Sequence, residues 1–265
     1  MSCSAWSACA TYSAPASLVA ERSGRLVQPG RPDGYGETMA SDIKDRARRT
    51  NVAWTAGPVY LTIRSLVRCL LWPYFRTRVT GRENIPPGGP VILAPVHRSN
   101  LDSLMLSPLT RRRLRALAKE SLFEAAPMAW LMASLGAFPV RRDSADRESM
   151  RIARELLAEQ NLLLVFPEGK RHEGDRVAEL FDGTAWLAAR TGSRVVPVGI
   201  AGTGDAMPTG ARLPRPTKVR MVVGPAIQPP EPKASRSALR VWTEGLAAAL
   251  QAAQDEAVGG RTGTG

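Results

Sequence analysis

The sequence has few of the residues that build covalent or metal-bound frameworks. Its 265 residues include three cysteines and two histidines. The cysteines, at positions 3, 9 and 69, have no metal-ligand spacing, so we expect a reducing compartment, no disulfide framework and no metal site. Acidic residues are also scarce, since 24 Asp and Glu stand against 36 Lys and Arg, a formal net charge of +12. This excess favours polyanionic partners such as lipid headgroups, phosphorylated substrates or nucleic acid.

Long uninterrupted apolar runs are missing as well. Residues 125–140 form a charge-free apolar stretch of 16 residues, fewer than the roughly 20 that a membrane-spanning helix needs. The longer run at 54–75 is interrupted by Arg64 and Arg68. Aromatic residues make up only 6% of the chain, and it carries no recognised nucleic-acid motif. We therefore expect no spanning helix and no nucleic-acid partner.

Composition divides the chain into four regions. Residues 1–38 are rich in Ser, Ala, Gly and Pro without periodicity, which predicts a disordered tail or a mis-assigned extension, with Met39 as the native start. The other three regions are a basic amphipathic helix region at a membrane interface (39–77), the main domain (78–250) and a flexible C-terminal tail (251–265).

Apolar side chains recur at helical spacing between Val59 and Phe75. Arg64, Arg68 and Trp72 edge this apolar face, as is typical of a helix lying in a membrane interface. The alternative is a helix that packs on the core and exposes a solvated basic side.

Within the main domain, short apolar runs alternate with amphipathic segments. "VILAPV", "AFPV", "LLLVF" and "RVVPVGI" are typical of buried strands, and "DRESMRIARELLAEQ" of an amphipathic helix. The pattern predicts an α/β fold: a single domain with a mostly parallel central sheet flanked by helices and preceded by an amphipathic N-terminal helix.

Polar side chains follow three of the predicted strands. His97 and Asp102 follow "VILAPV", Arg141 and Arg142 follow "AFPV", and residues 168–171 follow "LLLVF". In open α/β sheets, ligands bind outside the carboxyl ends of the strands. The three clusters therefore predict one site at that edge.

His97 and Asp102 have the chemistry of a general base and its orienting acid. Their spacing suits this role if the chain turns after the strand and a helix begins near Asp102, with Ser99 or Asn100 as its cap. Taken alone, the pair also fits a loop histidine and a helix-capping aspartate.

The segment "FPEGKR" places a carboxylate and two cations in a glycine-containing loop. The guanidinium of Arg171 can grip a phosphate through two parallel hydrogen bonds. Backbone N–H groups near Gly169 are candidate donors to an anion or a developing oxyanion. A charged surface turn is the alternative.

Four segments in order, "HRSNLD", "GAFPVRR", "FPEGKR" and "VVPVGI", resemble the signature blocks of the glycerophospholipid acyltransferase family. The bacterial 1-acylglycerol-3-phosphate acyltransferases are the most similar type, and the likeness covers about residues 78–229. By this resemblance His97 is the general base and Asp102 its partner. For the acceptor's phosphate it implicates Arg142, with Arg141 beside it, and the residues of the third block, which also shape the acceptor site: Glu168, Gly169, Lys170 and Arg171. Pro197 and Gly199 are implicated in acyl-donor binding or packing.

Two positions depart from the family pattern. Lys170 stands where the family usually has a small hydroxyl residue, and Arg141 where an Asp is common. Both add positive charge near the expected phosphate site. Neither residue changes the expected chemistry. Both leave open which acceptor the protein uses.

The resemblance implies transfer of a fatty acyl group from acyl-CoA or acyl carrier protein to the sn-2 hydroxyl of 1-acyl-sn-glycerol 3-phosphate, which gives phosphatidate. The thioester is a co-substrate, and we expect no other cofactor. A serine nucleophile is disfavoured because the chain has no G-x-S-x-G motif. We expect a peripheral protein bound to the anionic cytoplasmic face of the cell membrane.

Two alternatives remain open at this point. One keeps the chemistry and changes the acceptor to another lysolipid or a glycolipid. The other is a non-catalytic basic protein that binds anionic membranes, with Arg111–Lys119 as its best patch. In the catalytic interpretation, that patch is a solvated face or a headgroup contact.

Overall fold

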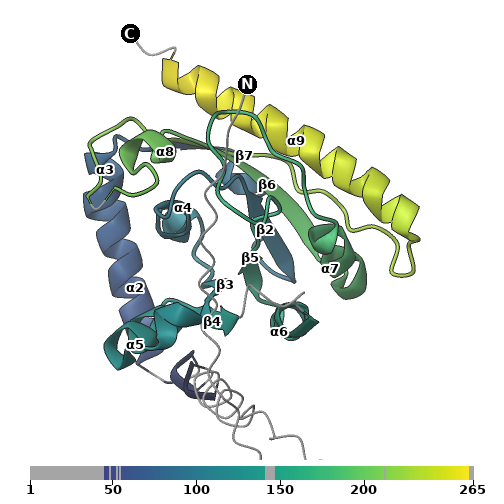
Figure 1. Cartoon of the computed structure of the whole chain (residues 1–265), viewed down its shortest axis with the longest axis horizontal. Helices are drawn as coiled ribbons and strands as arrows, with labels where there is room; N and C mark the ends of the chain where they lie inside the picture. Colours follow the sequence, from purple (N-terminus) through teal and green to yellow (C-terminus); the bar gives the residue numbers. More distant parts are fainter. Residues whose placement is uncertain are drawn as a thin grey trace, which may run out of the picture.

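The computed structural model describes residues 45–47, 49–51, 53, 55–140, 147–211 and 213–262 (Figure 1). The predicted tail at 1–38 lies outside these residues. The strands are β1 (Arg78–Thr80), β2 (Val91–Pro95), β3 (Leu114–Lys119), β4 (Ala137–Val140), β5 (Leu162–Leu164), β6 (Arg194–Ala201) and β7 (Arg220–Val223). The helices are α2 (Ala56–Leu66), α3 (Trp72–Tyr74), α4 (Asp102–Leu106), α5 (Ala126–Ser134), α6 (Arg147–Ala158), α7 (Gly183–Thr191), α8 (Thr203–Ala206) and α9 (Arg236–Thr262).

These strands form one sheet in the order β1-β7-β6-β2-β5-β3-β4. Neighbours from β6 to β4 are parallel, β7 is antiparallel to β6, and β1 is parallel to β7. The mostly parallel α/β fold is therefore confirmed. Strand β2 lies inside the sheet between β5 and β6, so its carboxyl end is flanked by two other carboxyl ends.

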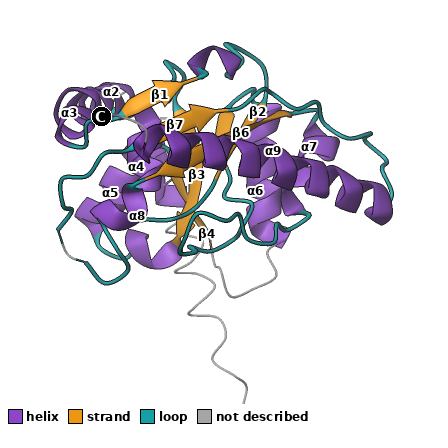
Figure 2. Ribbon diagram, turned by 90° about the horizontal axis from the view of Figure 1, so that it is seen from above, coloured by secondary structure: helices purple, strands orange, loops and turns teal. Residues whose placement is uncertain are grey.

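The sheet is covered by helices on both faces (Figures 1 and 2). Successive side chains of a strand point to opposite faces, and β2 shows the consequence. Val91 and Leu93 belong to a core cluster that includes residues of α4, whereas Ile92 and Ala94 join a cluster with residues of α6, α7 and α9. A strand buried on both faces has the continuous apolar sequence that "VILAP" shows.

The N-terminal helix matches the helical spacing between Val59 and Phe75. Helix α2 continues through a π-helical turn, η1 (Val67–Leu71), into α3. Tyr60 and Val67 are buried against the domain, and other large apolar side chains of the same helix are exposed: Leu61, Leu66, Leu70 and Tyr74. No described helix combines the length and the apolarity needed to cross a bilayer.

The predicted flexible tail from residue 251 is wrong, because α9 continues to Thr262. Ala253, Gln254 and Ala257 are buried. A Cβ atom on Gly199 of β6 would lie 2.2 Å from the carbonyl oxygen of Ala253, so only glycine permits the helix to lie this close to the strand. Tertiary packing of small side chains thus extends a helix through a sequence that is rich in polar residues and glycine.

The prediction for Arg111–Lys119 is also wrong for its central arginines. Arg112 donates hydrogen bonds to the carbonyl oxygens of Pro86, Gly89 and Gln160. Arg113 donates to the carbonyl oxygens of Asn51, Ala133 and Ser134, and Arg115 to the side chain of Asn51. These arginines lie at the amino end of β3, where they join loops. Their hydrogen bonds go to the protein itself, so they do not form the solvated face that the sequence predicts.

Candidate active site

The site begins where β2 ends. After Pro95 the chain turns, and the carbonyl oxygen of Ser99 accepts the N–H of Asp102, the first residue of α4. Of the two predicted caps, Ser99 is used in part, because its hydroxyl oxygen accepts the backbone N–H of Leu101 just before α4, while the same hydroxyl donates to the carbonyl oxygen of Met207. This bond ties the turn to the segment that follows α8.

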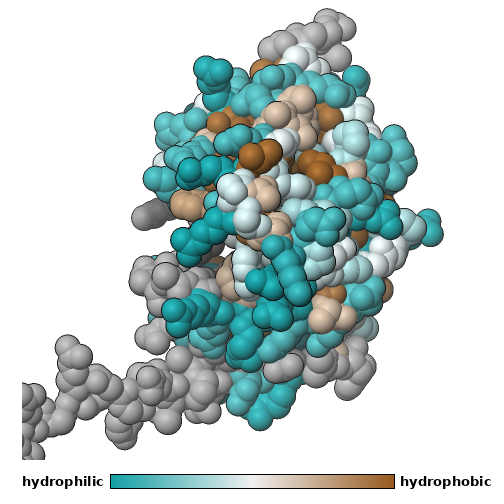
Figure 3. Space-filling model, turned by 90° about the vertical axis from the view of Figure 1, so that its right-hand side faces the viewer, coloured by the Kyte–Doolittle hydropathy of each residue, from teal (hydrophilic) through white to brown (hydrophobic). Residues whose placement is uncertain are grey.

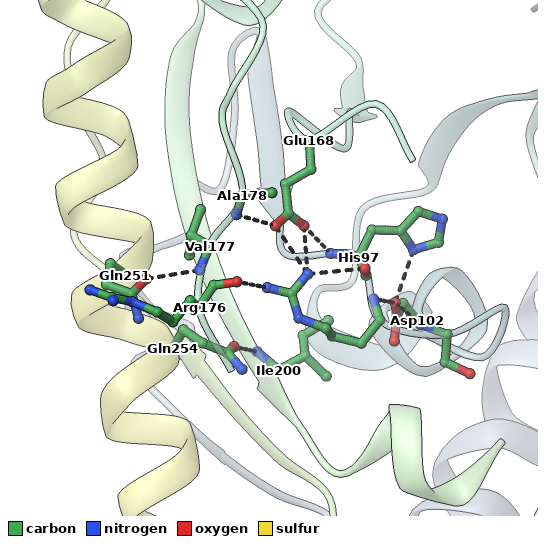
Figure 4. Close-up of polar contacts among 11 residues, drawn as sticks. His97, Asp102, Glu168, Arg176, Val177, Ala178, Ile200, Gln251 and Gln254 are labelled. Carbon is green, nitrogen blue, oxygen red and sulfur yellow. Dashed lines mark hydrogen bonds and ion pairs between the residues drawn. The ribbon is translucent and has the colours of Figure 1, made fainter. Parts of the chain in front are cut away.

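The turn brings His97 and Asp102 together, as the sequence predicts. Nδ1 of His97 lies 3.0 Å from Oδ2 of Asp102. An ionised carboxylate can only accept, so Nδ1 carries the proton and Nε2 is the free acceptor. In Figure 4 this second nitrogen points away from Asp102. The pair has the arrangement of a base and its orienting acid.

Asp102 is fully buried and is itself fixed by the turn. Its Oδ2 also accepts the backbone N–H groups of Arg98 and Ser99, at 2.7 and 2.8 Å. The ring of Phe166 stacks on the imidazole of His97, with 3.8 Å between centroids and 20° between planes. The His97 side chain keeps 12% of its surface exposed, so a substrate can reach the ring.

Glu168 lies next to His97, and its described contacts are with the protein itself. It is 1% exposed. Its Oε2 accepts the backbone N–H of His97 at 2.7 Å, and both carboxylate oxygens accept Nη1 of Arg98, at 2.8 and 3.0 Å. A buried carboxylate already paired with a cation does not bind an anionic substrate phosphate. The described contacts therefore place Glu168 beneath the His97 turn and lend no support to the prediction that it contacts the acceptor's phosphate.

The rest of this loop is split between structural and exposed groups. Gly169 has a φ of +70°, and a Cβ there would lie 2.7 Å from the ring of Phe181. The N–H of Gly169 donates to the carbonyl oxygen of Phe166, and the N–H of Lys170 donates to the backbone carbonyl oxygen of Glu168. These N–H groups are thus used within the loop, contrary to their suggested role toward an oxyanion. The side chains of Lys170 and Arg171 are exposed beside the site.

Comparison with known proteins supports the same segments. A family model described as Acyltransferase matches residues 76–201, the region that contains the His97 turn and the loop after β5. A 1-acyl-sn-glycerol-3-phosphate acyltransferase from Chlamydomonas reinhardtii is 36% identical over 163 residues, which cover 59% of this chain and 48% of the relative. These matches support the glycerophospholipid acyltransferase family for residues 76–201.

Two further members illustrate the extent of the likeness. The chloroplastic 1-acyl-sn-glycerol-3-phosphate acyltransferase LPAT1 of Arabidopsis thaliana is 30% identical over 144 residues, covering 53% of this chain and 40% of that protein. The chain thus spans less than half the length of these two curated relatives. The crystal structure of the 1-acyl-sn-glycerophosphate acyltransferase PlsC from Thermotoga maritima shares the fold, with a TM-score of 0.63, 24% identity, and coverage of 84% of this chain and 88% of that one.

Only part of the second signature segment, "GAFPVRR", lies within the described residues. Arg141 and Arg142 lie outside the described residues, directly after β4. Strand β4 is the third strand from β2 on that side of the sheet. At about 4.8 Å per strand, its carboxyl end is roughly 14 Å from that of β2. The block therefore begins at the same edge of the sheet and at a distance from His97.

The fourth block lies within β6. Pro197 and Gly199 are buried, and Pro197 pairs in register with Ala94 of β2. Gly199 admits the backbone of α9, as described above. The resemblance implies either donor binding or packing for this block. For Gly199, the close approach of α9 supports packing.

Sequence reasoning missed three residues that shape this site. Arg98 is the buried partner of Glu168, Phe166 stacks on His97, and Gln251 of α9 binds the segment above Glu168. Arg98 and Phe166 could have been suspected from the sequence, because they lie next to or near the predicted site residues His97 and Glu168. Nothing in the sequence links position 251 to this site.

Proposed function

We propose that this protein transfers a fatty acyl group from an acyl thioester to the free sn-2 hydroxyl of 1-acyl-sn-glycerol 3-phosphate, giving phosphatidate. Acyl-CoA and acyl carrier protein are the candidate donors. The observation that carries the proposal is the buried Asp102 bonded to His97 at the carboxyl end of β2. The family match and the printed names of the relatives supply the reaction class and the acceptor.

The chemistry follows from the free nitrogen of His97. Nε2 takes the proton of the acceptor hydroxyl while its oxygen attacks the thioester carbonyl carbon. Asp102 stabilises the imidazolium that results. The tetrahedral intermediate then expels the thiolate, which takes the proton back from His97. No covalent enzyme intermediate is needed, and much of the rate comes from holding both substrates in one place.

Lys170 and Arg171 are the described cations that suit the acceptor's phosphate. Both are exposed in the loop after β5, the strand next to β2. Arg142, with Arg141 beside it, is the further candidate that the family pattern supplies. A phosphate bound by these cations would place the glycerol hydroxyls toward the sheet edge.

We also propose that the protein works at the cytoplasmic face of the cell membrane, with the α2–α3 region lying in the interface. Leu70 of η1 is 61% exposed, and Leu61 and Leu66 of α2 are exposed as well. Arg68 is exposed on the same helical segment, and Arg64 is half-buried there, so Arg68 is the better placed of the two for anionic headgroups. Figure 3 views the side of the molecule away from α2, and there hydrophobic side chains are scattered among hydrophilic ones.

The first experiment mixes the purified full chain with an acyl-CoA and lysophosphatidate in detergent and follows thiol release and product mass. We expect phosphatidate, and its loss in His97→Ala. The matched control is His172→Ala, since His172 is the other histidine of the chain and its imidazole makes no hydrogen bond to a described residue. Transfer only to another acceptor would correct the substrate. An active His97→Ala enzyme would end this mechanism.

The membrane proposal has its own pair of variants. Leu70→Glu places a charge on the α2–α3 region, and Val241→Glu does the same at a similarly exposed position of α9, at its end far from α2 (Figures 1 and 2). In co-sedimentation with anionic vesicles, we expect binding to fall for Leu70→Glu alone. Equal binding of both variants would exclude this face as the contact.

A further inference from the structure

The segment between β5 and α7, residues 165–182, crosses the carboxyl edge of the sheet without a helix or strand of its own. Its course is therefore set by hydrogen bonds to its surroundings. The carbonyl oxygen of Arg176 accepts Nη2 of Arg98 at 2.9 Å, and the N–H of Ala178 donates to Oε1 of Glu168 at 2.9 Å. The N–H of Val177, between them, donates to Oε1 of Gln251 at 2.8 Å. Residues 176–178 are thus held from both sides.

Glu168 is the junction of this arrangement. One of its carboxylate oxygens accepts the N–H of His97, the other accepts the N–H of Ala178, and both accept the guanidinium of Arg98. The side chains of Arg98 and Glu168 are 5% and 0% exposed. Charge-assisted bonds between buried groups are short and directional, so they fix the backbone to which they connect.

Gln251 extends this arrangement to α9. Its amide oxygen holds Val177, and its amide nitrogen donates to Asp255 one turn further along the helix. Figure 4 shows the resulting series of contacts, from Gln251 through Val177 and Ala178 to Glu168 and then to His97. Gln254 of the same helix accepts the N–H of Ile200, which fixes α9 to β6.

We infer that Arg98, Glu168 and Gln251 are positioning residues for His97, and that α9 takes part in catalysis through them. The inference rests on the proposed role of His97 as general base. A base must be held within a fraction of an ångström of its productive place, and a displacement of about 1 Å costs about 100-fold in rate. Loss of a positioning residue therefore lowers kcat and leaves the KM of each substrate nearly unchanged.

The decisive variants are at Gln251, because it lies on a long helix and is partly exposed. Gln251→Ala removes the acceptor for Val177. Gln251→Glu keeps one, and it is made together with Asp255→Asn so that position 255 can donate to the new carboxylate instead of repelling it. We expect kcat to fall about tenfold in the first variant, with KM within about twofold, and to recover most of its value in the second. Arg261→Ala is the control, since it removes a different polar contact of α9, an ion pair with Asp205 of α8. We expect no change in kcat there.

Glu168→Gln tests the junction itself. Half of its carboxylate becomes an amide nitrogen that cannot accept from His97 or Arg98, so we expect kcat to fall about 100-fold. If this variant does not fold, as shown by circular dichroism, the Gln251 pair decides alone. Equal losses in Gln251→Ala and Arg261→Ala, or no rescue by Gln251→Glu, would mean a general loosening of α9 and would overturn the inference.

A second readout does not depend on activity. With two histidines in the chain, the ring signals of labelled histidine give a simple NMR spectrum, and His172→Gln assigns the His97 signal. We expect the His97 signal to shift in Gln251→Ala and to stay unchanged in Arg261→Ala. If the wild-type protein transfers no acyl group, the proposed function fails and this signal alone decides. An unmoved His97 signal, or a wild-type kcat in folded Gln251→Ala, would overturn the inference.

Discussion

The two edges of the sheet each hold an arginine side chain, which is buried for Arg98 and half-buried for Arg113, and the two arginines have different kinds of partner. At the carboxyl edge, Arg98 is paired with the carboxylate of Glu168. At the amino edge, Arg113 donates to three backbone carbonyl oxygens, and desolvation by burial, followed by the nearby charge of Arg115, lowers the pKa of its guanidinium to about 10. Arg113 is therefore still charged at neutral pH, although its surroundings favour the charge less than water does.

The proposed catalytic site thus lies at the carboxyl edge, whereas the arginines of the amino edge connect loops to one another. Neutral carbonyl oxygens satisfy the donors of a guanidinium and tie loops together, but they do not orient a reacting group. The Arg98–Glu168 pair can orient His97, because Oε2 of Glu168 also accepts the backbone N–H of His97. Variants at the carboxyl edge should consequently change rate, and variants at the amino edge should change stability.

The largest effect is expected at the carboxyl edge in Asp102→Asn. The amide cannot both accept the Nδ1 proton of His97 and balance the charge of an imidazolium, so kcat should fall about 10²- to 10⁴-fold. Initial rates at saturating substrate measure this, with circular dichroism to show that the fold is kept. A loss smaller than tenfold would remove Asp102 from the mechanism.

The next effect is expected at the amino edge in Arg113→Met. It removes a donor from the carbonyl oxygens of Asn51, Ala133 and Ser134, of which that of Ala133 still accepts the N–H of Gly136. This change should lower the free energy of unfolding by about 2–3 kcal/mol. Its neighbour Arg111 is exposed, so Arg111→Met is a matched control, expected to stay within about 0.5 kcal/mol. Denaturant unfolding measures both, and kcat of the folded enzyme should change in neither. A strong loss of kcat in Arg113→Met would break the division between the edges.

A smaller, pH-dependent effect is expected for Tyr60, which lies at the same edge. Its hydroxyl oxygen accepts the N–H of Leu114, and burial raises the pKa of Tyr60 above 10. The folded state then holds the proton more tightly than the unfolded state, so this contribution to stability is present below pH 10 and is lost as pH rises through the raised value. Tyr60→Phe should cost about 1 kcal/mol at pH 7, and the cost should shrink above pH 10. Unfolding at the two pH values checks it, and an equal cost at both would contradict the shift.

The smallest effect is expected for Cys69→Ala. Cys69 is exposed on η1, and the mechanism uses no thiol. Acyl transfer should stay within twofold of the wild type. A larger loss would give this cysteine a part that the proposed mechanism does not contain.

Much of the fold could be predicted from the sequence because its signals are local. "VILAPV" and "RVVPVGI" are apolar over their whole length, and Gly192 ends α7 with a φ of +64°. The His97–Asp102 pair could be predicted for the same reason, since one turn of chain joins the two residues.

The differences from these expectations all concern side chains whose partners are distant in the sequence. Glu168 was assigned to a substrate because a loop carboxylate gives no sign of Arg98, 70 residues earlier. Arg113 was assigned to solvent because its acceptors are backbone carbonyl oxygens, which leave no trace in a pattern of side chains. The end of α9 was taken for a tail because its small residues become buried only against β6 and β7.

The position of β2 inside the sheet has a consequence for biosynthesis. Both of its neighbours, β5 and β6, follow it in the chain, and Gln251 follows His97 by 154 residues. At about 5–20 residues per second, a ribosome needs roughly 8–30 s between these two positions. For about the first two-thirds of that interval, until Ala201 at the end of β6 has been made, the edges of β2 lack one or both partners, and such edges are prone to aggregation. A nascent chain must therefore be shielded until β6 emerges, and a product truncated before β6 cannot assemble the site.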